Sequence, residues 1–184
     1  MSAERPSTRD LNGSGLSIAI LCSRYNEEVT AALCAGAQRT LAELGVAEEG
    51  IERVFVPGAF ELPVVAQHLA RSGTYDAIIA LGAVIRGETG HYELVATAAA
   101  SGIARVALDT GVPVVFGVLA TDTVEQARAR AGGALGNHGE DAARAAVEMA
   151  MLLRRIARAR DRAPVDAGGA KLESRRHGAP PGSC

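Results

Sequence analysis

The stretch Ala77-Ile78-Ile79-Ala80-Leu81-Gly82-Ala83-Val84 is apolar throughout, and the polar, glycine-rich segment 86–90 follows it closely. A short apolar run that ends near glycines is typical of a parallel strand that is buried on both faces. The residues after the turn have the length and composition of a helix. This part of the chain therefore predicts a strand over 77–84, a turn, and a helix over about 89–108.

Three other apolar runs are each followed by a helical segment in the same way. Asn26 is expected to cap the helix after the first run, and Pro63 to lie in the first turn of the next helix. Strands that alternate with helices imply right-handed crossovers and a parallel sheet covered on both faces. The predicted strands are 16–22, 52–56, 77–84 and 113–119, and the later helices are about 123–131 and 139–159, with Gly132, Gly133 and Gly136 between them. We therefore predict a three-layer α/β/α, flavodoxin-like domain with a four-stranded parallel sheet over residues 14–159.

The two ends of the chain differ from this core. Residues 1–13 lack hydrophobic periodicity, and residues 160–184 contain few large apolar side chains. Such segments bury too little surface to offset the entropy of ordering. We expect a flexible N-terminal segment over 1–13 and a disordered tail over 160–184, in which the basic cluster 175–177 is a solvated charge run.

Composition excludes several classes of partner. The 184 residues carry a formal net charge of −2, which gives no electrostatic reason to expect nucleic acid. No apolar stretch approaches the roughly 20 residues that cross a bilayer, and the N-terminus lacks the apolar core of a secretory signal. Cys22 and Cys34 fit small core residues, and the cysteines do not have a metal-ligand spacing. We expect a cytoplasmic protein with a small-molecule ligand and no membrane, nucleic-acid or metal partner.

Unusual residues gather where the predicted strands end. Four features lie at or just after the end of an apolar run, namely Tyr25, the segments 56–61 and 82–91, and Phe116. Ligands of open α/β sheets bind beyond the carboxyl ends of the strands, so the four segments point to one site. The free backbone N–H groups at the helix start after 82–91 suit a phosphate, although glycines in such a turn can be mere geometry. The segment has neither a Walker A nor a GxGxxG pattern.

Several side chains are candidates for chemistry, each with a plainer alternative. His91 lies in a first helical turn, where the helix dipole disfavours imidazolium, so it is a general acid/base candidate or a capping residue. Arg130 and His138 flank the glycine-rich joint and could close over a phosphate, or could be solvated. Asp141 could orient either of them, or only favour its helix start.

The few aromatic residues suggest a flat ligand. The chain has three Tyr, three Phe and no Trp, yet Tyr25, Phe60 and Phe116 are at predicted strand ends. A stacked heterocycle would explain this placement, while core packing is the alternative for Phe116. Glu61 could bond sugar-like hydroxyls or start its helix with a favourable charge.

Five ordered blocks together resemble the 6,7-dimethyl-8-ribityllumazine synthase family, over about residues 14–157. The blocks are 24–27 (RYNE), 56–63 (VPGAFELP), 82–92 (GAVIRGETGHY), 113–119 (PVVFGVL) and 136–143 (GNHGEDAA). The resemblance implies a transferase for the penultimate step of riboflavin biosynthesis. That reaction condenses 5-amino-6-(D-ribitylamino)uracil with 3,4-dihydroxy-2-butanone 4-phosphate and releases phosphate and water, without a metal or organic cofactor.

The resemblance also implies roles for individual residues. Tyr25 takes the place of the family aromatic that stacks on the pyrimidine, and His91 that of the proton-transfer histidine. Glu88 and Thr89 would bind the phosphate, with Arg130 as its counter-charge. The remaining pocket residues implied are Ala59, Phe60 and Glu61 at the ribityl amine, Ala83, Val84 and Ile85 at the pyrimidine, and Phe116, which is supplied to the site of an adjacent subunit.

Two departures from the family pattern bear on the phosphate. His138 stands where the family often has Lys, which implies that phosphate affinity falls as rising pH deprotonates it. Glu88 puts an acid beside the proposed phosphate site, so the assignment requires its side chain to point to solvent.

The resemblance implies a homo-oligomer built from pentamers. Because the joint 131–139 is short and carries no insertion, we expect the 60-subunit shell, with riboflavin synthase as a candidate partner. A non-catalytic flavin- or lumazine-binding paralogue, a structural shell protein and a flavodoxin-type electron carrier are the alternatives, and the retained His91 and Arg130 argue against the first.

Overall fold

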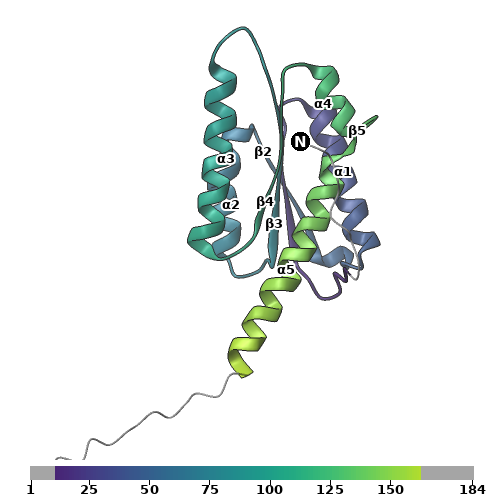
Figure 1. The fold of residues 1–184 in the computed structure, drawn as a ribbon, viewed down its shortest axis with the longest axis vertical. Coiled ribbons are helices and arrows are strands. Elements are labelled where there is room, and N and C mark those ends of the chain that lie inside the picture. The colour runs from purple at the N-terminus through teal and green to yellow at the C-terminus, as the bar shows by residue number, and fades with distance from the viewer. Residues whose placement is uncertain (1–10, 163–184) are drawn as a thin grey trace, which may run out of the picture.

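The computed structural model describes residues 11–162, which contain a four-stranded parallel sheet. Its strands are β1 (Ile18–Ser23), β2 (Ile51–Val56), β3 (Ala77–Ile85) and β4 (Val114–Thr121). They lie in the order β2-β1-β3-β4, and every neighbouring pair is parallel. The carboxyl ends of all four strands consequently meet at one edge of the sheet (Figure 1).

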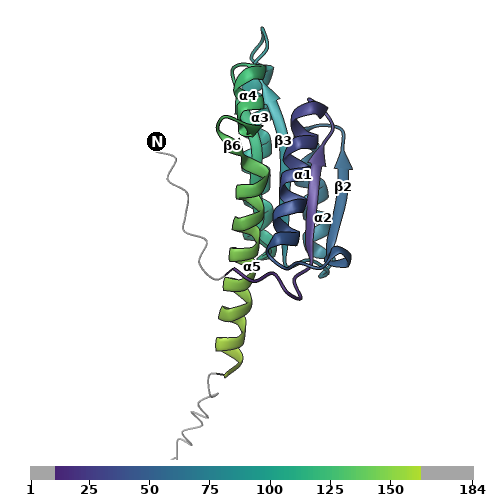
Figure 2. The same cartoon turned by 90° about the vertical axis from the view of Figure 1, so that its right-hand side faces the viewer.

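Helices cover both faces of this sheet (Figure 1). On one face lie α1 (Glu27–Glu43) and α5 (His138–Arg162), and on the other lie α2 (Leu62–Arg71) and α3 (His91–Thr110). The short α4 (Val124–Arg130) lies at the carboxyl edge, on the side of α1 and α5, and the end of α5 extends beyond the sheet (Figures 1 and 2). The predicted three-layer α/β/α fold is confirmed.

Alternate residues of the two central strands build two separate cores. In β1, Ile18 and Ile20 pack under α1 and α5, while Ala19 and Leu21 pack under α2 and α3, and all four are 0% exposed. Strand β3 alternates in the same way. A fully buried Ile or Leu side chain contributes about 1.5–3 kcal/mol, so these strands account for a large share of the folding free energy. Cys22 and Cys34 are both buried in the first core, as predicted.

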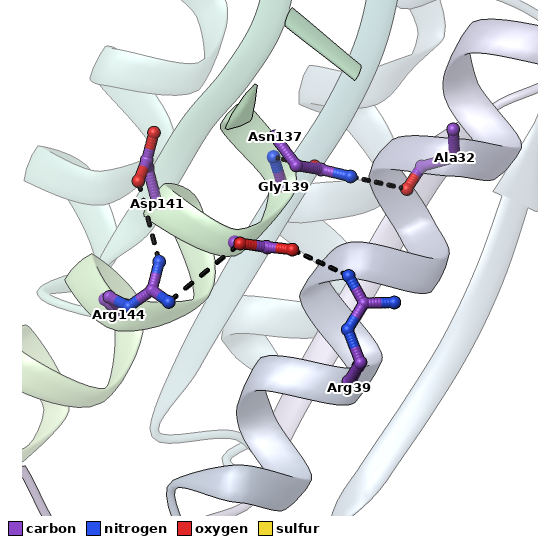
Figure 3. Close-up of polar contacts among 7 residues, drawn as sticks. Ala32, Arg39, Asn137, Gly139, Asp141 and Arg144 are labelled. Atoms are coloured by element: carbon purple, nitrogen blue, oxygen red, sulfur yellow. Dashed lines mark hydrogen bonds and ion pairs between the residues drawn. The ribbon is translucent and has the colours of Figure 1, made fainter. Parts of the chain in front are cut away.

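The start of α5 packs very closely on α1. A Cβ atom on Gly139 would lie 2.0 Å from the carbonyl oxygen of Leu33, so only glycine fits there. The buried Asn137 donates from Nδ2 to the carbonyl oxygen of Ala32 (2.9 Å) and accepts from the backbone N–H of Gly139 (2.8 Å) (Figure 3). Asn137 thus joins the first turn of α5 to the middle of α1.

The opposite end of the domain is held by an ion pair between α5 and the start of β3. The guanidinium of Arg154 bonds both carboxylate oxygens of Asp76 at 2.7 Å and the carbonyl oxygen of Gly15 at 2.8 Å. Asp76 also accepts from the backbone N–H of Ser17. This network fixes the lower half of α5 against the sheet.

The structure differs from the sequence prediction at three places. The glycine-rich joint forms a small antiparallel hairpin of β5 (Ala131–Gly133) and β6 (Gly136–Asn137), with a positive φ at Gly132 and Gly136. Asn26 precedes α1 in the left-handed conformation (φ 58°), and its side chain does not cap the helix. Strand β4 continues to Thr121 rather than ending at 119, and Phe116 lies in its first half rather than at the strand end.

Two 3₁₀ turns, Glu48–Gly50 and Ala59–Glu61, precede β2 and α2. The predicted N-terminal segment 1–13 and tail 160–184 lie largely outside the described residues, and α5 continues through the first residues of the predicted tail. Within residues 11–162, no helix combines the length and apolar character needed to cross a membrane.

Candidate functional site

A cavity of about 750 Å³ opens at the carboxyl edge of the sheet, between the strand ends and the start of α3. Four segments that are far apart in the sequence line it. These are the β1–α1 turn, the turn after β2, the end of β3 and the first turns of α3. The lining residues are Tyr25, Asn26, Gly58, Ala59, Phe60, Glu61, Ala83, Val84, Ile85, His91, Leu94 and Val95.

Backbone hydrogen bonds hold the first two of these segments together. The amide of Tyr25 donates to the carbonyl oxygen of Pro57 at 3.1 Å, and the amide of Arg24 donates to that of Val56 at 2.9 Å. A Cβ atom on Gly58 would lie 3.1 Å from the Tyr25 ring, so glycine allows the ring to pack against this turn. The side chains of Tyr25 and Phe60 remain 72% and 61% exposed, which leaves two aromatic surfaces for a ligand.

Glu61 is fixed by its own turn. Its Oε2 atom accepts from the backbone N–H of Gly58 at 2.9 Å, which satisfies a free donor at the start of the 3₁₀ turn. The favourable helix-start role considered from the sequence is therefore present. The same bond holds the carboxylate at the wall of the cavity, close to Phe60 and Ala59.

The end of β3 forms another wall, made of Ala83, Val84 and Ile85. Asn26 donates from Nδ2 to the carbonyl oxygen of Ala83 at 2.8 Å, so the side chain that was expected to cap α1 instead ties the β1–α1 turn to β3. Asn adopts the left-handed backbone conformation more easily than most residues, so Asn26 can turn the chain here and still place its side chain against β3.

His91 is the first residue of α3 and contributes its side chain to the cavity wall. Leu94 and Val95, which the sequence analysis did not single out, lie beside it. They follow His91 by three and four residues, the spacing that places side chains on one helix face. This periodicity could have identified them once His91 was chosen.

Glu88 and Thr89 lie in the exposed turn just before α3, outside the lining of the cavity. The hydroxyl oxygen of Thr89 lies 3.4 Å from the amide nitrogen of His91 and accepts its hydrogen bond. The turn is therefore continuous with the histidine that borders the cavity, and its backbone N–H groups are at a helix start.

Besides Glu88 and Thr89, four predicted site residues do not reach the cavity of their own chain. Phe116 pairs with Ala80 in mid-sheet and is 45% exposed. Arg130 donates to the carbonyl oxygen of Gln126, on α4, at 3.0 Å. His138 is exposed at the start of α5, and Asp141 lies 3.6 Å from Arg144 in the ion-pair cluster that also joins Glu140 to Arg39 (Figure 3).

This separation has a simple structural cause. Helices α4 and α5 belong to the layer of α1, whereas His91 and Phe60 lie in the layer of α2 and α3 (Figure 1). One chain therefore brings together the aromatic, carboxylate and imidazole groups, and holds Arg130, His138 and Asp141 on the other side of the sheet. Phe116 shares the α2 and α3 side with Val114 and Val118, but it does not line the cavity.

The cavity combines apolar walls with a small set of polar groups. Two aromatic rings, a fixed carboxylate and an imidazole are arranged around a space large enough for a bicyclic heterocycle. Such a surface can stack a flat ring, bond hydroxyl substituents and exchange a proton. Among the described residues, no group of three or more His, Cys, Asp or Glu side chains is placed to hold a metal ion.

The chain matches the family model described as 6,7-dimethyl-8-ribityllumazine synthase over residues 15–154. The match includes all four strands of the sheet and every segment that lines the cavity. The members of this family are transferase enzymes. The chain therefore belongs to the 6,7-dimethyl-8-ribityllumazine synthase family.

Proposed function

We propose that this protein catalyses the reaction for which its family is named. It would condense 5-amino-6-(D-ribitylamino)uracil with 3,4-dihydroxy-2-butanone 4-phosphate to give 6,7-dimethyl-8-ribityllumazine, phosphate and water. The single observation that carries the proposal is the cavity, which gathers His91, Glu61, Tyr25 and Phe60 from separate segments of the matched region.

The pyrimidine substrate fits the apolar and aromatic part of the cavity. The exposed ring of Tyr25 is available to stack on the pyrimidine, and the β3 residues 83–85 would border the ring. Glu61, Phe60 and Ala59 would hold the ribityl amine, with the Glu61 carboxylate on the ribityl hydroxyls. Because its backbone bond fixes this carboxylate, little ordering entropy is lost on binding.

His91 would move the protons that the condensation requires. The substrate amine attacks the ketone and loses water to form an imine, and phosphate then leaves by elimination. The remaining amine attacks the second carbonyl and loses a second water as the ring closes. Each of these steps adds or removes a proton at nitrogen, carbon or oxygen, and an imidazole next to the reacting atoms can both donate and accept one. No net oxidation or reduction occurs, and the family resemblance implies that neither a metal nor an organic cofactor takes part.

The phosphate would bind the backbone N–H groups and hydroxyl of Glu88 and Thr89. Arg130 and His138 would supply the positive charge, and Asp141 would orient them. These three residues do not line the cavity of their own chain, so we infer that they come from a second copy of the protein, as the family resemblance implies for Phe116. A complete site is then formed only between neighbouring subunits.

Lumazine formation tests the proposed reaction directly. The full-length protein is incubated with the two substrates, and the product is followed by its absorbance and fluorescence. His91→Ala should lower turnover by roughly 10- to 10⁴-fold, the range expected for general acid/base help. The matched control is His68→Ala, in the last turn of α2, which should leave turnover unchanged because His68 is exposed and does not line the cavity.

A parent protein that forms no lumazine would reject the reaction and favour a non-catalytic ligand-binding or purely structural role. Normal turnover in His91→Ala would instead reject only the role of that histidine.

We further propose that the protein assembles through pentamers into a 60-subunit shell, with riboflavin synthase as a candidate partner. The turn between β5 and β6 contains only Ala134 and Leu135, so nothing bulky redirects the start of α5. Sedimentation at neutral pH measures the assembly. A single species near five times 18.9 kDa would contradict the shell and leave the enzymatic proposal intact.

A further inference from the structure

Arg86, the first residue after β3, makes three contacts that the proposed reaction does not use. Its Nε atom bonds Oδ1 of Asp122 at 2.7 Å, and its Nη1 atom bonds a carboxylate oxygen of Glu93. Its guanidinium carbon lies 4.4 Å from the centre of the Tyr92 ring, within the range of a cation–π contact. We call Arg86, Tyr92, Glu93 and Asp122 the Arg86 cluster.

The Arg86 cluster spans both ends of the turn 87–90. The backbone N–H of Arg86 donates to the carbonyl oxygen of Thr121 at 2.9 Å, which fixes the start of the turn to the end of β4. Tyr92 and Glu93 belong to the first turn of α3, and a Cβ atom on Gly90 would lie 3.9 Å from the Glu93 carboxylate. One guanidinium therefore links the end of β3, the start of α3 and the segment that follows β4.

The cluster also places two carboxylates beside this turn. Arg86 donates to Glu93 and thereby holds the pKa of that carboxyl below its ordinary value. Asp122 and Glu93 carry like charges near each other, and their shared guanidinium offsets the repulsion between them. Without Arg86, both carboxylates would face the turn with their charges uncompensated.

We propose that Arg86 is a positioning residue for binding of the phosphorylated substrate. It holds the turn 87–90 in the conformation that presents its backbone N–H groups, and it neutralises Glu93 and Asp122 near the incoming phosphate. Arg86 acts through the turn, because its Nε and Nη1 atoms are bonded to Asp122 and Glu93 and these two bonds hold the guanidinium beside residues 87–90. This inference rests on the proposed function, and specifically on phosphate binding by Glu88 and Thr89.

The position of the cluster determines which kinetic constant changes. The cluster borders the turn and lies outside the cavity lining that would bind the pyrimidine. Loss of Arg86 should therefore raise KM for the butanone phosphate, while KM for the ribitylaminouracil and kcat at saturation remain near the parent values. Exposed ion pairs are individually weak, so we expect a rise of about three- to tenfold.

The experiment compares Arg86→Gln with Arg105→Gln in the full-length protein. Arg105 is an exposed arginine on α3 that pairs with Asp109 at 3.3 Å, remote in sequence from the turn, and is the matched control. Initial rates are measured against each substrate separately, and amide hydrogen exchange is measured over residues 87–90. We expect Arg86→Gln alone to raise KM for the butanone phosphate and to speed exchange in the turn, and Arg86→Lys to recover part of the affinity.

A second variant keeps the inference testable if Arg86→Gln does not fold. Asp122→Asn retains the guanidinium and one ion pair, and should change the same KM in the same direction by a smaller factor. An unchanged KM for the butanone phosphate, or an equal rise in KM for both substrates, would overturn the positioning role. Failure of the parent itself to make lumazine would instead reject the proposed function, so the two failures are distinguishable.

Discussion

Replacement of Asn137 by alanine provides a sharp test of how α5 is attached to the domain. The carboxamide of Asn137 is a buried polar link between the start of α5 and α1, through the carbonyl oxygen of Ala32 and the amide of Gly139, beside the more exposed Arg39–Glu140 ion pair. Alanine removes both bonds and leaves the space that the carboxamide occupied. The backbone geometry needs no change, so the effect should come from the lost side chain alone.

The expected loss of stability depends on what each hydrogen-bond partner of Asn137 loses. The Gly139 N–H is buried and would lose its acceptor, which costs about 1–3 kcal/mol. The Ala32 carbonyl belongs to the interior of α1 and also serves the helix ladder, so the loss of its second donor adds less. Together with the small void, we expect Asn137→Ala to lower the free energy of unfolding by about 2–3 kcal/mol.

The measurement is the urea midpoint of unfolding at one fixed protein concentration, because assembly adds to apparent stability. The matched control is Asn12→Ala. Asn12 also accepts from the amide two residues ahead, that of Ser14 at 2.9 Å, but it is exposed, so its loss should cost less than about 0.5 kcal/mol. If the two variants were destabilised equally, burial of the Gly139 amide could not be the cause.

Three further expectations follow from other contacts. Tyr75 donates a hydrogen bond to Glu52, which raises the pKa of Tyr75 to about 12. This bond therefore stabilises the fold fully below pH 10, and the stabilisation is lost as the pH rises toward 12. Tyr75→Phe should remove the last step of the tyrosinate absorbance titration. Arg154→Ala should lower the free energy of unfolding by about 1–3 kcal/mol, because Asp76 loses both guanidinium bonds. The urea midpoint should fall accordingly, and an unchanged midpoint would mean that this network is dispensable. Arg130→Ala should weaken the binding of inorganic phosphate, measured by isothermal titration, roughly ten- to a hundredfold, since a charge-assisted bond contributes about 1.5–3 kcal/mol. Equal affinity in the variant and the parent would mean that Arg130 is not part of the site.

The sheet and its helices were predictable because each central strand is buried on both faces. Runs such as 77–84 cannot alternate with polar residues when both faces pack against helices, and this leaves a strong signal in the sequence. Tyr25, Phe60 and His91 could be selected for a related reason. Segments that follow parallel strands converge at one edge of a sheet, so distant residues become neighbours without any detailed knowledge of loops.

Other features depend on interactions that sequence patterns do not encode. Asn26 has the composition of a helix cap, but a tertiary bond to Ala83 competes for its side chain and prevails. The β5–β6 hairpin uses strands of only three and two residues, too short for any periodicity. Phe116 lies within the outer strand β4 and is 45% exposed, so its place in the strand is not marked by burial.

The separation of Arg130 from the cavity of its own chain has a genetic consequence. If every site takes His91 from one subunit and Arg130 from the next, a chain that lacks one residue can still lend the other to its neighbour. Co-expression of His91→Ala and Arg130→Ala chains in equal amounts would then form about a quarter of all sites with both residues intact, as random mixing around a ring requires. If the proposed function holds, the two variant chains would thus complement each other within a single assembly, whereas an assembly of either variant alone would contain no site with both residues intact.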